Sequence, residues 1–269
     1  MNFESVNIGN KVFRDEKRKN NVQGAIMKRL LILTMMCALI GSMVALESDP
    51  SEVVGYVKYE CVTTTTTDMN LVSVALDNGV TTAQDLAAEI GAAGVVDAVS
   101  KWDEATQSWQ QVTYSFIPVP PPGGFAWSGN FDIVNGDVLA VNVTSDVDYY
   151  CAGSIPADPV YNLITTTTTD ANLVMLPLSM SSLSNAQDLA NDIGAAGDVD
   201  AVSSWDAATQ SWQQVTYSFI PVPPPGGYAW SGNFDIEIGK GYMINMTTNT
   251  TWPSDDLNDS GFSSHKVKK

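Results

Sequence analysis

The sequence predicts an α+β fold that is mainly antiparallel β, built from two tandem homologous modules, each a small sheet- or sandwich-like domain with one amphipathic helix. Three observations lead to this prediction. Residues 105–124 recur without a change as residues 208–227, and AWSGNFDI appears shortly afterwards in both copies. The period of 102 to 103 residues fits one small domain rather than a solenoid unit. Each copy also has one stretch of helical periodicity among segments that favour strands.

The start of the chain predicts export. Residues 27–45 combine a charged beginning, a short apolar run and small residues before a cleavage point after Ala45, which is the pattern of a secretory signal peptide. The apolar run is too short for a comfortable membrane span, so no span is expected after cleavage. Residues 1–26 are expected to be a non-native or disordered extension ahead of a natural start at Met27. A genuine long n-region is the alternative.

The rest of the chain divides into five parts. They are an N-terminal segment or strand (46–60), module 1 (61–153), a linker (154–162) expected to be extended, module 2 (163–252) and a disordered tail (253–269).

Charge excludes two classes of partner. The whole chain carries a net charge of −17, and residues 1–45 contain seven of the basic residues and three of the acidic ones. The remainder therefore has 6 basic and 27 acidic residues, a net charge of −21, and no arginine. Binding to phosphate backbones depends on Lys and Arg, so we expect neither nucleic acid nor an anionic membrane surface as a partner. A solvated acidic surface explains the charge.

Two cysteines remain after cleavage. Cys61 opens module 1 and Cys151 closes it, whereas module 2 has Leu163 and Ser254 at the equivalent positions. The first and last strands of a compact domain often lie side by side, so we predict a disulfide. In the chain-entropy model it would contribute about 4–5 kcal/mol. Two free thiols are the alternative, and the spacing fits no zinc motif.

The first half of each module predicts two strands and a helix. The threonine run at residues 62–67, repeated from residue 164, is β-branched and favours an extended strand. Residues 71–76 and 173–178 predict a second, largely buried strand. The apolar residues of the helix then follow at i, i+3, i+4 and i+7. They are Ala83, Leu86, Ala87 and Ile90 in module 1, and Ala186, Leu189, Ala190 and Ile193 in module 2.

Capping residues are predicted at both ends of this helix. Thr81 with Gln84 reads as a capping box, and Gly91 stands where a C-terminal glycine belongs. Module 2 has the same residues or close equivalents, namely Ser184, Gln187 and Gly194.

The second half of each module predicts a hairpin and closing strands. Residues 99–102 and 108–114 form the hairpin, with Trp102 facing Trp109. The proline-rich loop at residues 118–124 is unsuited to an inner strand. Residues 131–134 and 138–144 then predict the closing strands. Their alternating inward residues are Leu139, Val141 and Val143, matched by Tyr242, Ile244 and Met246 in module 2.

Several motifs resemble those of a known group. VVGYV at residues 53–57, directly after a signal peptide, is similar to the mature start of many bacterial secreted proteins. NLVxxxL, AQDLAxxIG, the Trp-Asp and Ser-Trp hairpin and GKGYMINMT are similar to small repeated β-rich modules of bacterial and archaeal surface proteins. The resemblance implies an extracellular, non-catalytic module and supplies no catalytic residues. Module 1 departs from it with Asn135-Gly136-Asp137-Val138 where module 2 has Ile238-Gly239-Lys240-Gly241, which puts equal function of the two copies in doubt.

The residues that carry chemistry are sparse. The single histidine, His265, lies in the tail, and the chain has no HExxH, CxxC, P-loop or dinucleotide motif. We therefore expect no enzyme and no cofactor. A polysaccharide hydrolase with a carboxylate pair is a distant alternative, since acidic residues are abundant.

Two features are typical of binding sites. Phe125, Trp127, Tyr228 and Trp230 flank the proline-rich loops, and exposed aromatic faces stack on sugars or on partner side chains. The alternative is that the two tryptophans fold back to cap the cores.

The second feature is acidic. Asp68 with Asn70, and Asp170 with Asn172, place oxygen ligands at alternate positions that could help to hold calcium. Neither pair has the glycine and distal glutamate of an EF-hand, and an ordinary Asx turn also explains it.

The sequence therefore predicts a secreted, extracellular or periplasmic protein that acts as a non-catalytic interaction or structural protein of the cell surface or extracellular matrix. Its expected partner is an extracellular protein or a polysaccharide, and the alternative function is that of a carbohydrate-binding module pair. A shared ligand is expected at residues 118–127 and 221–230, with Trp127 and Trp230 partly exposed.

Overall fold

A computed structural model describes residues 54–65, 68–118, 122–167, 170–221 and 225–253. The predicted extension, the signal peptide and the tail beyond Pro253 lie outside these residues.

Each module consists of strands and one helix. Module 1 contains β1 (Val54–Cys61), β2 (Asp68–Ser73), α2 (Ala83–Ile90), β3 (Val96–Asp103), β4 (Ser108–Ile117), β5 (Gly124–Trp127), β6 (Val138–Val143) and β7 (Val147–Ser154). Module 2 contains β8 (Tyr161–Leu163), β9 (Asp170–Met175), α3 (Ala186–Ile193), β10 (Val199–Asp206), β11 (Ser211–Ile220), β12 (Gly227–Trp230), β13 (Gly241–Met246) and β14 (Thr250–Trp252).

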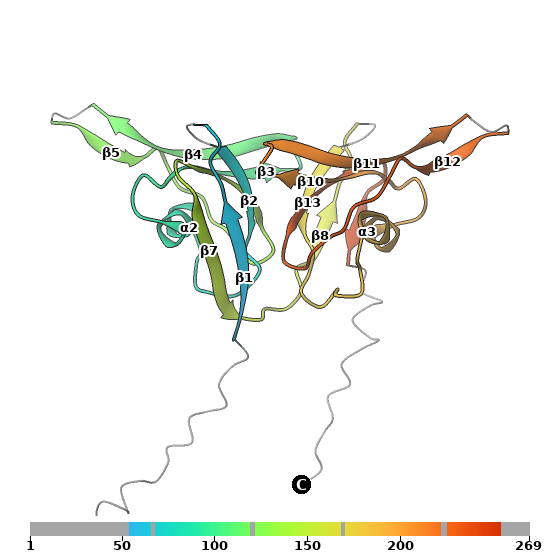
Figure 1. The fold of residues 1–269 in the computed structure, drawn as a ribbon, viewed down its shortest axis with the longest axis horizontal. Helices are drawn as coiled ribbons and strands as arrows, with labels where there is room; N and C mark the ends of the chain where they lie inside the picture. The colour runs from blue at the N-terminus through green and yellow to red at the C-terminus, as the bar shows by residue number, and fades with distance from the viewer. Residues whose placement is uncertain (1–53, 66–67, 119–121, 168–169, 222–224, 254–269) are drawn as a thin grey trace, which may run out of the picture. The chain divides into compact units, whose positions relative to one another are not determined.

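The two modules share one topology. A five-stranded sheet runs β2-β6-β3-β4-β5 in module 1 and β9-β13-β10-β11-β12 in module 2, and a two-stranded sheet pairs β1 with β7 and β8 with β14. Every pairing between these strands is antiparallel. Figure 1 shows the helix beside its sheet in each module. The predicted fold class is therefore confirmed. Residues 54–60 pair with β7, so they belong structurally to module 1.

Each module encloses its own apolar core. Residues of the helix, the five-stranded sheet and the two-stranded sheet meet in one buried cluster per module. The apolar helix residues predicted from the periodicity are all buried, and so are the six predicted inward residues of β6 and β13. Fully burying a leucine such as Leu86 or Leu189 contributes about 1.5–3 kcal/mol. This burial, more than intrinsic propensity, holds such short helices in place.

The N-cap of each helix lies one residue later than predicted. Thr82 is the N-cap, and its side chain accepts a hydrogen bond from the backbone N–H of Asp85. Asn185 does the same for Asp188 in module 2. Gln84 instead donates to the backbone carbonyl of Gly129 at 2.8 Å. The Thr82 hydroxyl also donates to the Asp85 carboxylate at 2.8 Å. An N-cap side chain of either type satisfies one of the free N–H groups of the first turn.

Gly91 ends the helix in an extended conformation, not a left-handed one. Its missing side chain has a packing reason, because a Cβ there would lie 2.7 Å from Cγ1 of Val95.

Two predicted strands are absent. The described part of the threonine run, residues 62–65, forms a loop, and the strand before it ends at Cys61. Residues 131–134 contribute only a single bridge between Asp132 and Thr82. The Trp102–Trp109 pair is confirmed, since the two residues are direct cross-strand partners with ring centroids 5.2 Å apart.

The predicted disulfide is wrong. Cys61 and Cys151 do lie on adjacent strands, but both are free and buried. In the register of β1 and β7, Cys61 pairs with Val147 and Cys151 pairs with Val57. The two cysteines are thus four residues apart along the ladder, about 13 Å at the usual rise per residue, which exceeds the bridging limit of about 7 Å between Cα atoms. Strand neighbours were predictable, whereas the register was not.

A third apolar cluster joins the two modules, so the predicted separation of their cores is incomplete. Ala75 and Val138 of module 1 pack with Leu173 and Met175 of module 2. The hydrogen bonds around the cluster are reciprocal. Tyr59 Oη donates to the Gly239 carbonyl at 2.7 Å, and its counterpart Tyr161 donates to the Gly136 carbonyl at 2.8 Å. Such mutual pairing is the mark of an isologous, two-fold-like interface.

The same interface covers two sheet edges. β2 and β9 are edge strands, and their outward backbone groups need partners. Gln107 accepts from the N–H of Ala171 in β9 and donates to its carbonyl, at 2.8 and 2.9 Å. Gln210 does the same for Met69 in β2, at 2.9 Å each. The indole N–H groups add further bonds, from Trp102 to the Ala171 carbonyl and from Trp205 to the Met69 carbonyl, both at 2.8 Å.

We expect no disulfide in solution. Reducing agent should leave the mass of the chain lacking residues 1–45 unchanged. Cys61 and Cys151 should react with a thiol dye only after unfolding, because both are buried and burial raises the pKa of Cys61 to about 11 and also raises that of Cys151. Mass spectrometry and dye titration with and without denaturant measure this, and a mass gain on reduction would contradict it.

The glutamine contacts should stabilise the whole chain. Replacing Gln107 or Gln210 by Ala removes three hydrogen bonds, two to the facing edge strand and one within the turn. It leaves the N–H of Ala171 or Met69 unpaired, at a cost of about 1–3 kcal/mol per glutamine. We expect a lower Tm for each variant in thermal unfolding. Gln110→Ala is the control, because Gln110 is exposed on β4. Equal Tm values for Gln107→Ala and Gln110→Ala would refute this role.

Candidate functional site: two aromatic arms

Each module extends a two-stranded arm beyond its body, which Figure 1 shows for β4 with β5 and for β11 with β12. Arm 1 is defined as residues 114–117 paired with residues 124–127, and arm 2 as residues 217–220 paired with residues 227–230. The paired segments flank the proline-rich loops identified in the sequence. β5 and β12 are edge strands, and the described prolines Pro118, Pro122, Pro221 and Pro225 lie outside the ladders, as their missing N–H requires.

Arm 1 presents four aromatic rings on one face. Tyr114 is paired with Trp127, and Phe116 with Phe125. Side chains two residues apart on a strand share a face, as do direct cross-strand partners, so all four rings lie together. The centroid of the Phe125 ring is 5.8 Å from that of Tyr114 and 5.6 Å from that of Phe116. Tyr114 is also 5.5 Å from Trp127.

The row runs from partly buried to exposed along the arm. Trp127 is half-buried and packs against the core of module 1, whereas Phe116 and Phe125 are 54% and 66% exposed. Arm 2 repeats this arrangement with Tyr217, Phe219, Tyr228 and Trp230. Tyr228 is 67% exposed and Trp230 is half-buried against the core of module 2. Contiguous exposed apolar surface is the kind of feature that marks interaction sites on proteins.

Both interpretations of the tryptophans hold in part. Trp127 and Trp230 contact the cores, which agrees with the interpretation that they cap them. Both also keep part of their surface accessible, which agrees with the prediction of partly exposed indoles. The sequence reasoning missed Tyr114, Phe116, Tyr217 and Phe219. The Tyr-Ser-Phe alternation before the proline-rich loops was the available signal, but it indicates a shared face only once the hairpin register is known.

A shallow apolar hollow of about 260 Å³ lies beside the rings of arm 1. Tyr114 and Trp127 form one side, and small residues of helix α2 and of the turn after it, among them Ala88, Gly91 and Ala92, form the other. Gly94 lies under Tyr114 with a φ of +90°, a conformation that favours glycine, although a Cβ there would be in ordinary contact with the ring, 4.0 Å from Cε1. Gly197 has the same position under Tyr217, with a φ of +97°.

The arms carry no charge. Residues 108–130 and 211–233 contain no Asp, Glu, Lys, Arg or His, in a chain whose net charge is −17. The aromatic faces are therefore uncharged areas on an acidic protein. Such a surface offers stacking and hydrogen bonding but no strong electrostatic attraction, and it suits an uncharged partner.

The acidic pairs predicted from the sequence form threonine-lined turns. The Asp68 carboxylate accepts from the hydroxyl of Thr64 at 2.6 Å and from the backbone and hydroxyl of Thr65 at 2.9 and 2.7 Å, with a further short bond from the Thr64 backbone N–H. Asn70 bonds both backbone groups of Val62. Asp170 and Asn172 repeat the arrangement in module 2. Both carboxylates thus accept bonds from residues three and four positions earlier in the chain, whereas an Asx turn bonds the backbone two residues later.

These hydrogen bonds lower the pKa of both carboxyl groups. For Asp68 the hydroxyl of Thr64 is the largest cause, and for Asp170 it is the hydroxyl of Thr166, and each pKa falls to about 2. Within the described ranges, no group of three or more His, Cys, Asp or Glu side chains could hold a metal ion.

Two further hollows lie at the interface between the modules. The first, of about 230 Å³, is bounded by Lys101, Trp102 and Glu104 of module 1 and by Tyr161 of module 2. The second, of about 480 Å³, lies at the equivalent position on the other side of the interface, with the roles of the two modules exchanged. It is bounded by Ser204, Trp205 and Ala207 of module 2 and by Tyr59 of module 1. Ser204 and Ala207 stand where the first hollow has Lys101 and Glu104, so the second is larger.

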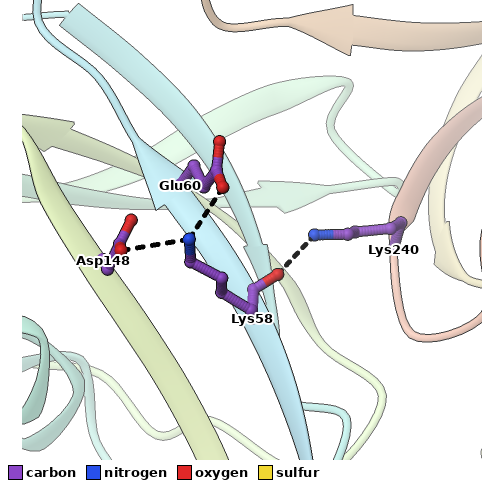
Figure 2. Close-up of polar contacts among 4 residues, drawn as sticks. All are labelled: Lys58, Glu60, Asp148 and Lys240. Atoms are coloured by element: carbon purple, nitrogen blue, oxygen red, sulfur yellow. Dashed lines mark hydrogen bonds and ion pairs between the residues drawn. The ribbon is translucent and has the colours of Figure 1, made fainter.

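A lysine crosses the boundary at the second hollow. Figure 2 shows Lys240 reaching from module 2 to the backbone carbonyl of Lys58, with Nζ 2.6 Å from the oxygen. The same ammonium lies 4.4 Å from the centroid of the Tyr59 ring, a cation–π contact. Burial lowers the pKa of Lys240. The Lys58 side chain points away and pairs with Glu60 at 2.7 Å and with Asp148 at 3.0 Å.

No protein-family model, curated protein or solved structure matches this chain. Among the described residues, no helix is long and apolar enough to cross a membrane.

Because of the threonine-lined turns, we expect the free energy of unfolding to decrease at acid pH. Because the pKa of Asp68 is lower in the folded chain than its usual value of about 3.9, its contribution is present above about pH 4 and is lost as the pH falls towards 2. We expect Asp68→Asn to lower the Tm at pH 6 and to narrow its gap to the wild type at pH 2. Thermal unfolding between these pH values measures this. Asp132→Asn, at an exposed carboxyl group, is the control, and a gap independent of pH would contradict the assignment.

Proposed function

We propose that this protein is an exported, non-catalytic attachment protein of the cell surface or extracellular matrix, and that it binds through its two aromatic arms. One observation carries the proposal: the chain presents the same row of four rings twice, on uncharged arms, with Phe125 and Tyr228 largely exposed. Surfaces rich in exposed aromatic side chains are typical of recognition sites.

The chemistry of the arms supports binding rather than catalysis. Residues 108–130 contain no carboxylate, imidazole, thiol or amine, so an arm offers no general acid or base that titrates near neutral pH. What it offers is a rigid row of ring faces. These interact with the faces of other rings or of sugars without consuming any reactive group.

Export is supported by the sequence alone. The signal-peptide pattern of residues 27–45 and the similarity to repeated β-rich modules of surface proteins are its basis. Cys61 and Cys151 are free, so no disulfide adds to this support.

A polysaccharide is the second candidate partner, and the hollow beside arm 1 favours it. Tyr114 and Trp127 stand over a floor of alanine and glycine residues, which leaves space for a flat pyranose ring against an aromatic face. The net charge of −17 favours an uncharged polysaccharide over an anionic one.

Two arms in one chain can increase affinity beyond that of either arm. When both engage one partner, the second contact forms at a high effective concentration, and avidity follows without any new type of contact. A polymer or a repetitive surface offers many copies of one binding group and satisfies this condition.

The proposal predicts a loss of binding on truncation of the exposed rings. Phe125→Ala and Tyr228→Ala each remove a side chain that is more than half exposed, so the fold should persist. Each single variant should weaken attachment about fivefold, the equivalent of about 1 kcal/mol for a stacked ring, and the double variant far more. Retention on insoluble cellulose, chitin and mannan, and on isolated cell-wall material, measures this.

The control is the double variant Ser115→Ala with Ser218→Ala, at exposed positions of the same arms on the opposite face. It should bind like the wild type. Unchanged binding of the Phe125→Ala, Tyr228→Ala double variant to every material that retains the wild type would exclude the arms as the binding site. Retention on cell-wall protein alone would favour the protein partner over the polysaccharide.

A further inference from the structure

The interface between the modules contains a position where a residue meets its own counterpart. Val138 of β6 and Gly241 of β13 are equivalent in the two modules. They are also in contact, because a Cβ built on Gly241 would lie 3.1 Å from Cγ2 of Val138 and would overlap its Cγ1. In an isologous interface, only residues next to the two-fold axis meet their own equivalents. Val138 and Gly241 therefore mark the pseudo-two-fold axis.

Side-chain size is complementary at this axis. Module 1 supplies a valine and module 2 supplies no side chain. Two copies of module 1 would place two valines in the space of one, which overpacks the interface. Two copies of module 2 would leave two glycines and an unfilled space, which loses contacts. The neighbouring equivalent pair, Ser73 and Met175, again combines a small with a large residue, and both are 1% exposed.

Charge is complementary as well. Lys240 donates to the carbonyl of Lys58 and lies over the ring of Tyr59, as Figure 2 shows for the carbonyl contact. Its counterpart in module 1 is Asp137, which pairs within its own module with Lys101 at 2.6 Å. In a pair of two modules 1, Asp137 would replace Lys240. Because Asp137 is held by Lys101, such a pair would lose both the bond from the ammonium to the Lys58 carbonyl and the cation–π contact with Tyr59.

We propose that this interface is a selective pairing surface, on which module 1 accepts module 2 and rejects a second copy of module 1. The determinants are Val138 against Gly241 and Lys240 against Tyr59. The partner that fits module 1 is thus a module with no side chain at the axis and a cation beside it. Selectivity of this kind needs elements that exclude the wrong partner as well as contacts that favour the right one.

The first test is a double-mutant cycle in the intact chain. Gly241→Ala introduces a methyl group that overlaps Val138 and should lower the Tm, although Gly→Ala in a strand ordinarily stabilises through the unfolded state. Adding Val138→Ala should restore at least half of that loss. Gly227→Ala is the matched control, since a Cβ there meets nothing within 4 Å. A double variant no more stable than Gly241→Ala alone would overturn the pairing of these two residues.

The second test addresses selectivity. A protease site is placed in the linker between residues 155 and 160 of the folded chain, the linker is cut, and the halves are unfolded in urea, refolded together and weighed by native mass spectrometry. We expect pairs of module 1 with module 2 and no pairs of module 1 with itself. In the Val138→Ala, Gly241→Ala chain, pairs of module 1 should appear. A statistical mixture of all pairs in the wild type would refute the selectivity.

Discussion

The structure depends on the reciprocal covering of two sheet edges. β2 and β9 each pair on one side only, and an uncovered edge strand invites pairing with other chains. Each module supplies the cover for the other, through the side chain of Gln107 or Gln210 and the indole beside it. These glutamines are the only non-glycine residues with positive φ in the described part of the chain. The strain of that conformation is tolerated because the turn aims the amide at the facing edge.

The two ends of each five-stranded sheet are treated differently. The β2 and β9 ends are covered within the chain, whereas the β5 and β12 ends are open four-residue strands with the aromatic rows on one face. Short edge strands limit uncontrolled pairing, so an arm can expose its rings at a moderate risk of aggregation. Exposed edge is thus removed from one end of each sheet and retained at the other, an arrangement that fits the proposed binding through the arms.

Local patterns predicted the elements that local physics determines. The 3.6-residue periodicity located both helices, and alternation located the inward residues of β6 and β13. Register, however, depends on the whole hairpin. It placed Cys61 opposite Val147, and it brought Tyr114 and Phe116 onto the face of Phe125. The threonine run failed as a strand because the Asp68 carboxylate offers its backbone and hydroxyl groups a better set of hydrogen bonds. The interface itself left no pattern within a single copy.

The position of a residue relative to the pseudo-two-fold axis explains why some parts of the two copies are identical and others differ. A residue of an arm never meets its counterpart, so both arms can carry the same best sequence for one ligand. A residue on the axis packs against its counterpart. Two identical side chains there overlap if they are too large for the space between the modules, and leave a gap if they are too small. Val138 with Gly241 resolves this by size. Beside the axis, Lys240 reaches Lys58 and Tyr59 of module 1, whereas its counterpart Asp137 pairs with Lys101 within its own module. Divergence at these positions is therefore compatible with the proposed identical binding by the arms. The segment at residues 135–138, which raised the doubt about equal function, contributes Gly136 and Val138 to the module interface and lies outside the arms.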